Sequence, residues 1–246
     1  MKTSAVTSVE DWESYWEDNF PLKYDLGYVG YTELYKKFLK PGGSCFEVGC
    51  YPGHTLLYMA KELGFKVSGI DYLPRVKTRT PTYLAENSVI AEELICEDFL
   101  SFKTIKSYDV VISNGFIEHF INFEEIIIKQ IQLVKPGGIM FMSCPNFTGL
   151  QYIFRYFLDK KSLQQHVISA MNLRKWRRIL EANGMEIMYH QYYRTAAFWV
   201  DEQPKTRWKR IAVRKIEGMC ERIDGRFSFP NRFLSPFMVS ISRRTS

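Results

Sequence analysis

The segment that decides the fold reads Cys45-Phe-Glu-Val-Gly-Cys-Tyr-Pro-Gly-His-Thr55, where an apolar, strand-like run ends in an acid and two glycines. A helical pattern starts directly after it. Gly49 and Gly53 allow the backbone to turn tightly and to approach a ligand, and the N–H groups that open the next helix face the same space. We therefore expect a crevice of nucleotide size behind the first strand.

A second carboxylate, Asp71, ends the next apolar run. An acid at this place can accept hydrogen bonds from both hydroxyls of a ribose. The spacing Glu47-x-Gly49-x-x-x-Gly53 differs from the Gly-x-Gly-x-x-Gly fingerprint of dinucleotide sites. The loop is therefore shaped for a nucleoside rather than for a pyrophosphate.

Apolar runs alternate with helical patterns along the chain, which is typical of a parallel sheet with crossover helices. The expected strands are residues 44–48, 66–70, 93–96, 108–113, 138–143, 185–193 and 237–242. One expected helix runs from His54 to Leu63 and stops at Gly64. Two more begin at the N-caps Asn122 and Asn172.

Three further segments follow the first one in a fixed order. They are Glu97-Asp-Phe99 after an apolar run, Tyr108 to Phe120 with its Glu118-His119 pair, and the Lys135-Pro-Gly-Gly138 turn. Over roughly residues 40–150 these segments resemble the motifs of class I S-adenosylmethionine-dependent methyltransferases. The resemblance implies a Rossmann-like, seven-stranded, mostly parallel α/β sheet with helices on both faces and an antiparallel C-terminal strand pair.

The resemblance also implies S-adenosyl-L-methionine as the methyl donor. The residues expected to contact it are Glu47, Gly49, Cys50, Gly53, Asp71, Tyr72, Asp98, Phe99 and Asn114. Among these, Asp98 corresponds to the acid that receives the adenine amino group. The family usually has a small residue where this chain has Tyr51, so we expect Tyr51 either to crowd the donor or to cover it.

Catalysis of methyl transfer needs little beyond placement, because a sulfonium carbon is already electrophilic. A neutral hydroxyl acceptor still gains from a general base, and His119 and His166 are the candidate catalytic residues. The alternative for His119 is a structural or donor-packing role. Asn114 and Asn146 stand where an acid pair would hold a metal, so no metal site is expected.

The expected domain organisation is an N-terminal helical cap over residues 1–40 and a methyltransferase domain over residues 41–246. Substrate-side insertions are expected at about 147–171 and 194–235, since long connections usually serve a substrate or a partner. The N-terminal tyrosines either close over the donor or the acceptor, or pack in the core; they are Tyr15, Tyr24, Tyr28 and Tyr31.

Charge is unevenly distributed along the chain. Residues 1–150 hold 14 Lys and Arg against 19 Asp and Glu, a net charge of −5, whereas residues 151–246 hold 19 against 8, a net charge of +11. The densest stretch, Lys205 to Lys215, includes Trp208 and suits an anionic substrate, a membrane surface or RNA. A solvated helix face explains it equally well.

The sequence shows no signal-peptide core and no apolar run of about 18 residues, which favours a cytoplasmic protein with peripheral membrane contact at most. The five cysteines form no Cys-x-x-Cys pair and are expected as buried, reduced thiols. An aromatic stretch at residues 147–158 indicates a partly apolar pocket.

We therefore expect a metal-independent methyltransferase that acts at oxygen on a small-molecule acceptor, or on one linked to a lipid or sugar and carrying an anionic group. Nucleic acid is disfavoured, because no RNA-binding module and no Asn/Asp-Pro-Pro-Tyr loop is present. The alternatives are a non-catalytic scaffold with this fold, an RNA methyltransferase that uses the basic C-terminal region, and a nicotinamide-dependent oxidoreductase.

Overall fold

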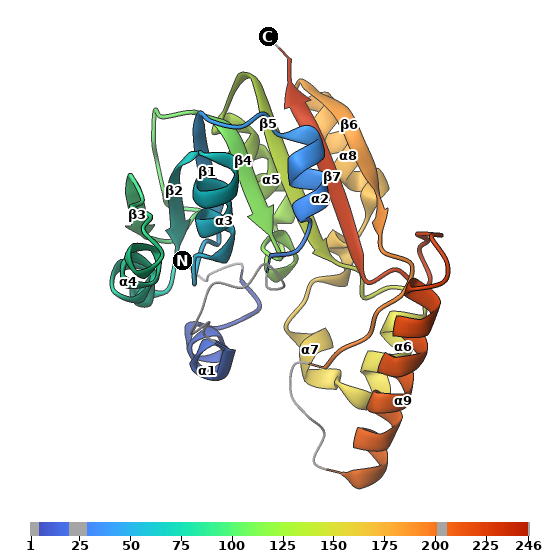
Figure 1. The fold of residues 1–246 in the computed structure, drawn as a ribbon. Helices are drawn as coiled ribbons and strands as arrows, with labels where there is room; N and C mark the ends of the chain where they lie inside the picture. The colour runs from blue at the N-terminus through green and yellow to red at the C-terminus, as the bar shows by residue number, and fades with distance from the viewer. Residues whose placement is uncertain (1–4, 20–28, 201–205, 246) are drawn as a thin grey trace.

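The computed structural model describes residues 5–19, 29–200 and 206–245. A seven-stranded sheet with the order β3-β2-β1-β4-β5-β7-β6 forms the centre of this part (Figure 1). The strands are β1 (Ser44–Val48), β2 (Lys66–Asp71), β3 (Glu93–Cys96), β4 (Tyr108–Asn114), β5 (Val134–Pro145), β6 (Met185–Tyr193) and β7 (Phe237–Arg244). β1 to β5 pair in parallel, and β7 runs antiparallel to both β5 and β6. The expected fold class is confirmed.

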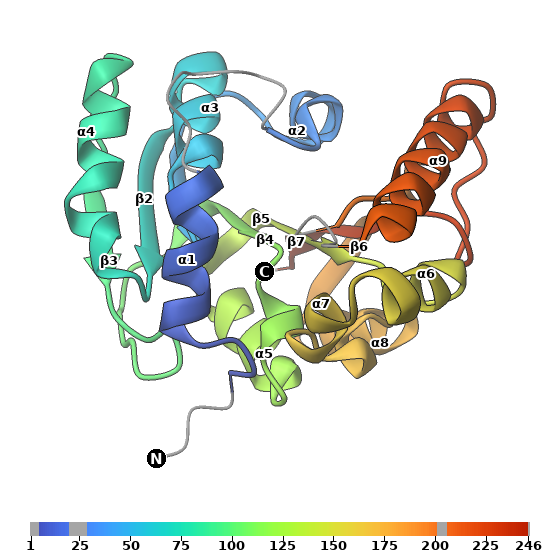
Figure 2. The same cartoon turned by 90° about the horizontal axis from the view of Figure 1, so that it is seen from below.

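Helices cover both faces of the sheet (Figure 2). The helices are α1 (Val9–Asn19), α2 (Thr32–Phe38), α3 (His54–Leu63), η2 (Pro74–Lys77), α4 (Arg79–Glu86), η3 (Ile117–His119), α5 (Phe123–Gln132), α6 (Leu150–Leu158), α7 (Lys160–Gln164), η4 (Ile168–Ala170), α8 (Leu173–Ala182) and α9 (Arg207–Asp224). One hydrophobic cluster joins the sheet to α2, α3 and α4, and a second joins it to α5 and α8. In β4, Val110 and Ile112 face the first cluster while Val111 faces the second, so the middle of this strand is apolar on both faces.

The helix ends follow local sequence in two of three cases. α3 stops at Gly64, which has φ 68° and donates its N–H to the Ala60 carbonyl, and α8 begins at Asn172, whose side chain accepts from the Lys175 N–H. The expected side-chain cap at Asn122 is wrong. Asn122 has φ −91° and ψ 39°, outside the extended region that capping needs, and its amide donates to the Glu125 carboxylate at 2.7 Å instead.

Two other local expectations are also wrong. β5 begins at Val134 rather than at residue 138, so the expected Lys135–Gly138 turn lies inside the strand, at an irregular register with β4 between Tyr108 and Val110. All five cysteines are free thiols, but Cys96, in the edge strand β3, is exposed rather than buried. The edge position explains this, because β3 has a neighbour on one side only.

Two connections extend away from the sheet. α6 and α7 lie between β5 and α8, and α9 lies between β6 and β7 (Figure 1). α6, α9 and the segments that join α9 to the sheet share a hydrophobic cluster of their own, centred on Phe198, Val213 and Cys220. We call α6, α7, α9 and these joining segments the arm. Within the described residues, no helix combines the length and the apolar character needed to cross a bilayer.

Candidate donor and acceptor site

A pocket of about 380 Å³ lies where β1, β2, β3 and β4 end. Its volume falls in the range of about 300–1,000 Å³ that is usual for small-molecule sites. Residues from four successive strand ends line it, and we call them the strand-end rim: Gly49, Tyr51, Asp71, Tyr72, Leu73, Glu97, Asp98, Phe99, Leu100, Asn114, Gly115 and Phe116. The carboxyl ends of a parallel sheet are where ligands bind in open α/β folds.

The loop after β1 depends on two glycines for its conformation. Gly49 has φ +78°, and a Cβ added there would lie 2.7 Å from the ring of Phe116. Gly53 has φ +111° and opens α3, where a Cβ would lie 2.8 Å from Thr80. Both positions therefore require glycine for conformation and for space. Gly49 lines the pocket, whereas Gly53 does not and instead precedes α3.

Asp71 ties this loop to the end of β2. One carboxylate oxygen accepts the Tyr51 N–H and the other accepts the Leu73 N–H, each at 2.9 Å. Burial raises the pKa of Asp71, and these backbone hydrogen bonds work against that rise. A carboxylate oxygen can accept more than one hydrogen bond, so Asp71 retains capacity for a ligand in the pocket. Tyr72, beside it, is exposed and also lines the pocket.

The end of β3 contributes an acid next to an aromatic wall. One oxygen of Asp98 accepts the Leu100 N–H at 3.0 Å, and the residue lines the pocket. Phe99 is buried, and its ring meets the ring of Phe116 edge-on, with centroids 5.9 Å apart. An apolar slot with a carboxylate at its edge suits a purine that carries an amino group.

Three other residues expected near the donor behave differently. Glu47 is buried below the lining, where desolvation and the nearby Asp71 raise its pKa to about 8, and its Oε2 has no hydrogen-bond partner among the described residues. Cys50 is buried and packs against Gly69, where a Cβ would lie 2.7 Å from its sulfur. Asn114 lines the pocket, but its amide donates to the Tyr35 hydroxyl and accepts from Ser143, each at 2.8 Å.

The two candidate histidines lie ring against ring beside the pocket. His119 lines the pocket, and His166, which does not, lies with its ring centroid 4.6 Å from that of His119. His119 Nδ1 lies 3.0 Å from the Gln165 carbonyl, and His166 Nδ1 lies 2.6 Å from the Ser162 carbonyl. Since a carbonyl only accepts, both Nδ1 atoms carry the proton in the neutral rings, and both Nε2 atoms are bases.

Glu118 completes a buried cluster with these histidines. Its Oε1 lies 4.0 Å from His119 Nε2, and its Oε2 has no hydrogen-bond partner among the described residues. Burial raises the pKa of Glu118 to about 8, whereas burial and the neighbouring His166 lower the pKa of His119 to about 3. The ligand atoms of the three residues lie within 4.8 Å of one another, a spacing that could hold a divalent metal ion or a shared proton. Asn146, by contrast, donates to carbonyls of the segment before β7.

A family model described as a methyltransferase domain matches residues 27–190, which is more than half of the chain. The chain is a member of the class I S-adenosylmethionine-dependent methyltransferases. The expected family and its donor, S-adenosyl-L-methionine, are thereby confirmed. The ubiquinone biosynthesis O-methyltransferase of Rickettsia prowazekii is 32% identical to this methyltransferase over 108 residues, which are 44% of this chain and only 42% of that protein.

Other relatives align over more of their length. The ubiquinone biosynthesis O-methyltransferase of Xanthomonas campestris pv. campestris is 27% identical over 198 residues, covering 74% of this methyltransferase and 82% of that protein. Among solved structures, the N-methyltransferase NodS from Bradyrhizobium japonicum, in complex with S-adenosyl-L-homocysteine, has a TM-score of 0.57 at 13% identity, covering 96% of this chain and 98% of that one. Phosphoethanolamine N-methyltransferase 2 of Haemonchus contortus has a TM-score of 0.59 at 17% identity, covering 98% and 57%. These likenesses show the shared fold.

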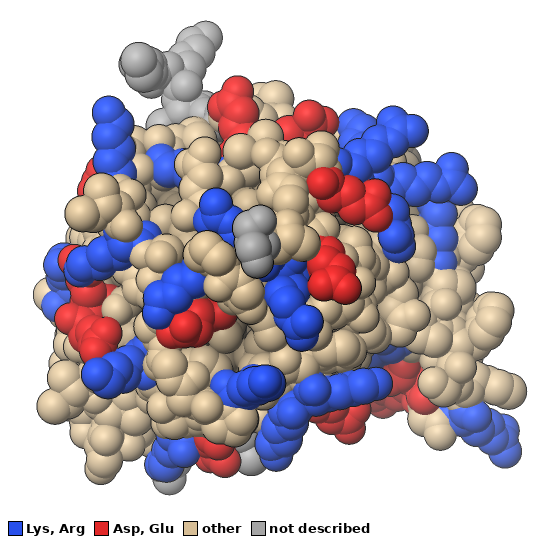
Figure 3. All heavy atoms as spheres, turned by 90° about the horizontal axis from the view of Figure 1, so that it is seen from above, with Lys and Arg blue, Asp and Glu red and all other residues tan. Residues whose placement is uncertain are grey.

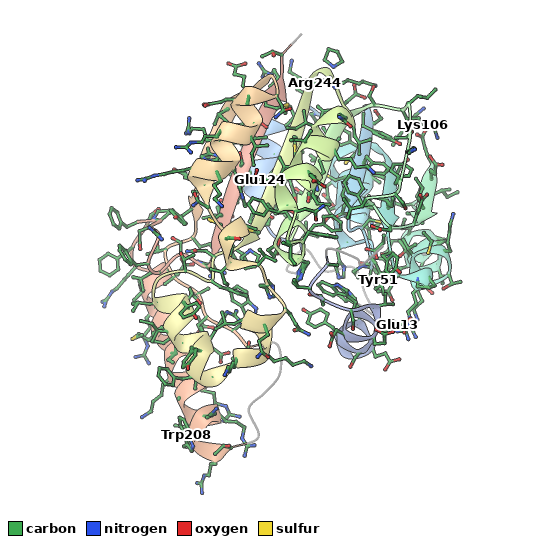
Figure 4. The ribbon with its side chains drawn as sticks, turned by 180° about the vertical axis from the view of Figure 1, so that it is seen from behind. Glu13, Tyr51, Lys106, Glu124, Trp208 and Arg244 are labelled. Atoms are coloured by element: carbon green, nitrogen blue, oxygen red, sulfur yellow. The ribbon has the colours of Figure 1, made fainter. Side chains whose placement is uncertain are left out.

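An N-terminal helical cap was expected from the sequence, but the residues with which it forms the other wall of the pocket in this methyltransferase were not. The wall comes from residues 5–17, which we call the N-terminal cover; its lining residues are Ala5, Thr7, Ser8, Val9, Glu10, Trp12 and Trp16. Figure 4 shows Tyr51 between the sheet and α1, the helix that carries Glu13. Val9, Trp12 and Trp16 recur at helical spacing, and this apolar stripe was the signal available in the sequence.

The cover is attached to the methyltransferase fold at both ends. The Val6 N–H donates to the His119 carbonyl at 2.8 Å, and the Thr7 hydroxyl lies 2.8 Å from His119 Nδ1. At the other end, Glu17 pairs with Arg75 of η2 at 2.9 Å. The cover therefore spans the pocket from the histidines to the end of β2.

Aromatic rings fill the contact between the cover and the rim. Trp12 meets the ring of His119 edge-on at 4.8 Å, and Trp16 meets the ring of Tyr51 edge-on at 5.8 Å. Tyr51 is 5% exposed, so this bulky residue lies under the cover. Tyr15 is partly exposed beside the tryptophans, Tyr31 packs among core aromatics, and Tyr24 and Tyr28 lie outside the described residues.

Proposed function

We propose that this methyltransferase transfers the donor's methyl group to an oxygen atom of a small or lipid- or sugar-linked acceptor, with no metal ion. The observation that carries the proposal is a neutral histidine base, His119, in the lining of a pocket that is also lined by acids from successive strand ends. The O-methyltransferase names of the sequence relatives support reaction at oxygen.

The pocket residues suit the parts of the donor. Asp71 offers acceptor capacity for the ribose hydroxyls, and Asp98 beside Phe99 offers an edge and a face for the adenine. The unpartnered oxygen of Glu47 lies below the loop after β1 and favours a cation above it, such as the donor's ammonium group. When bound, the donor supplies an electrophilic methyl group on sulfur.

His119 is proposed to take the proton from the acceptor hydroxyl. The Gln165 carbonyl and Thr7 hold its Nδ1 proton, so Nε2 is the basic atom. A protonated His119 would lie 4.0 Å from the Glu118 carboxyl, which can stabilise the new charge once it has itself lost its proton. The Glu118 pKa of about 8 therefore predicts that turnover rises as the pH passes through about 8.

We assign the N-terminal cover and the two connections at about 147–171 and 194–235 to the substrate side. The cover lines the pocket directly, and His166 belongs to the first connection. Trp12, Phe116 and Phe120 give the inner pocket an apolar surface, which suits an aromatic or prenylated acceptor.

The test is a methyl-transfer assay with labelled donor against matched acceptors, namely phenols, enols and sugar hydroxyls, each with and without a carboxylate. We expect methyl ethers as products, identified by mass spectrometry, and unchanged rates after dialysis against a chelator. Methylation at nitrogen would contradict the site of transfer. Loss of activity on chelation, restored by a divalent ion, would make Glu118, His119 and His166 metal ligands instead.

A further inference from the structure

We infer that the arm docks this protein on an anionic lipid bilayer through an exposed face of α9. α6 and α9 are set apart from the catalytic fold, since the hydrophobic cluster that they share is separate from the two clusters that pack on the sheet. Leu163 of α7 and Trp199 connect the arm to the second of these clusters. The arm extends beyond the pocket end of the sheet, with α6 and α9 side by side in both views (Figures 1 and 2). Trp208 lies at its far end, away from Tyr51 (Figure 4).

α9 presents one apolar stripe to the arm and a second one to solvent. Val213 and Cys220 are buried against the arm. On another side of the helix, Trp208, Ile211 and Met219 recur at helical spacing, with side chains 59%, 46% and 47% exposed. A helix that is apolar on a solvated face, beyond the stripe that it buries, marks a contact surface.

Exposed apolar side chains concentrate in the arm. Of the sixteen large hydrophobic residues that are exposed in the described part of the chain, eleven belong to it. Directly after α9, Phe227, Phe229 and Phe233 are 61%, 72% and 65% exposed. On α6, Tyr156 and Phe157 are also exposed. The face at the opposite end of the sheet carries both cations and acids (Figure 3).

Cations accompany the apolar stripe. Lys215 and Arg222 fall on the same side of α9 as Trp208, and Arg214 lies beside them. Within the described residues, none of these three cations forms an ion pair, while Asp224, at the end of the helix, is already paired with Arg194. An apolar stripe flanked by unneutralised cations is the pattern of a helix that lies in the interface of an anionic bilayer.

Two other occupants fit this face less well. A two-fold contact through this face would bring two positively charged surfaces together, because both copies present the same patch. Single-stranded RNA would use cations and aromatic rings, but Ile211 and Met219 offer no ring for a base to stack on. A bilayer accepts tryptophan, aliphatic side chains and cations together.

The test is co-sedimentation of the full chain with vesicles of phosphatidylglycerol and phosphatidylcholine, against vesicles of phosphatidylcholine alone. Neither donor nor acceptor is present, so the outcome does not depend on the proposed reaction. We expect the chain to bind the anionic vesicles. The double variant Arg214→Glu with Lys215→Glu should weaken this affinity at least about 25-fold, because each lost cation weakens it about fivefold. Ile211→Ser with Met219→Ser should weaken binding about tenfold.

The matched controls are Ile105→Ser and Lys40→Glu, which alter an exposed isoleucine and an exposed lysine outside the arm. Both should bind as the unaltered chain does, and thermal unfolding should show that every variant folds. Equal binding to both kinds of vesicle, or no effect of the arm variants, would overturn the inference. Two other results would also overturn it. One is a dimer of the unaltered chain that the arm variants dissociate in sedimentation velocity. The other is an unaltered chain that does not bind vesicles but retains RNA, with this retention lost in the arm variants.

Discussion

The strand-end rim and the N-terminal cover form opposite walls of one pocket, yet they are built on different principles. The rim consists of loops in which glycines permit the positive φ that the turns need and a carboxylate holds the backbone by accepting two N–H groups. The cover is an amphipathic helix held by two tryptophans, a few hydrogen bonds and one exposed ion pair. We therefore expect the rim to set donor affinity and chemistry, and the cover to control access.

The largest expected effect comes from the place where the two walls meet. His119→Ala should lower kcat by about 10²–10⁴-fold, because it removes the proposed base. Affinity for S-adenosyl-L-homocysteine, measured by isothermal titration, should change little. His166→Ala is the matched control and should cost less, since His166 lies behind His119 and does not line the pocket. Equal kcat in the His119 variant would assign this residue to packing.

Asp71→Ala should weaken donor binding by about 2–3 kcal/mol, roughly a hundredfold, through the lost hydrogen bonds to the ribose and the loosened loop after β1. The measurement is isothermal titration with the demethylated donor. Glu97→Ala, an acid that also lines the pocket but belongs to the β3 end, serves as the control and should have a smaller effect. If the Asp71 variant binds the demethylated donor with unchanged affinity, Asp71 does not bind the ribose.

Two buried acids near the pocket predict how stability depends on pH. Glu47 and Glu118 each have a pKa of about 8 in the folded protein, raised from 4.5, so the folded state binds more protons than the unfolded state between these values. The contribution of these two acids to the unfolding free energy should therefore fall as the pH rises from about 4.5 to about 8. Below about 6.5 the lowered pKa values of His54 and His119 act in the opposite sense, so a net fall is expected between about 6.5 and about 8. Urea denaturation over this range checks the slope.

The variants Glu47→Gln and Glu118→Gln should each flatten that dependence. Asp109→Asn is the control from outside the pocket, because Ser44 and Lys135 lower the Asp109 pKa to about 2. Its contribution lies at acid pH and has the opposite sign, present above about 3.8 and lost as the pH falls towards about 2. A slope that survives both glutamine variants would show that these carboxyls do not hold the extra protons.

The smallest effect is expected in the cover. Trp16→Ala removes the ring that meets Tyr51 and should speed release of the demethylated donor about five- to tenfold, with a weaker effect on kcat. Stopped-flow fluorescence measures the release. Tyr15→Ala, on the same helix but not in the pocket lining, should leave the rate unchanged. A hundredfold loss of affinity for the demethylated donor in the Trp16 variant would show that the cover, like the rim, sets donor affinity.

Sequence reasoning was most successful where a residue type is required by its own backbone. Gly49 and Gly53 have positive φ, and Gly64 and Asn172 end and begin helices through local hydrogen bonds. It failed where a neighbour decided the outcome. Asn122 turned to the carboxylate of Glu125, and the turn expected at Lys135–Gly138 became a bulge within β5, between its pairs Val134 with Tyr108 and Ile139 with Val110.

The amino-acid sequence alone therefore determined the order of the seven strands along the chain and the acids at the strand ends, because both follow from spacing along a short stretch of chain. Only the tertiary structure decided which side chains share the pocket. It turned Cys50 towards Gly69, used the Asn114 amide within the fold, and brought Thr7 and Trp12 to His119 over more than a hundred residues. Such contacts depend on how separate elements pack, which no local pattern encodes.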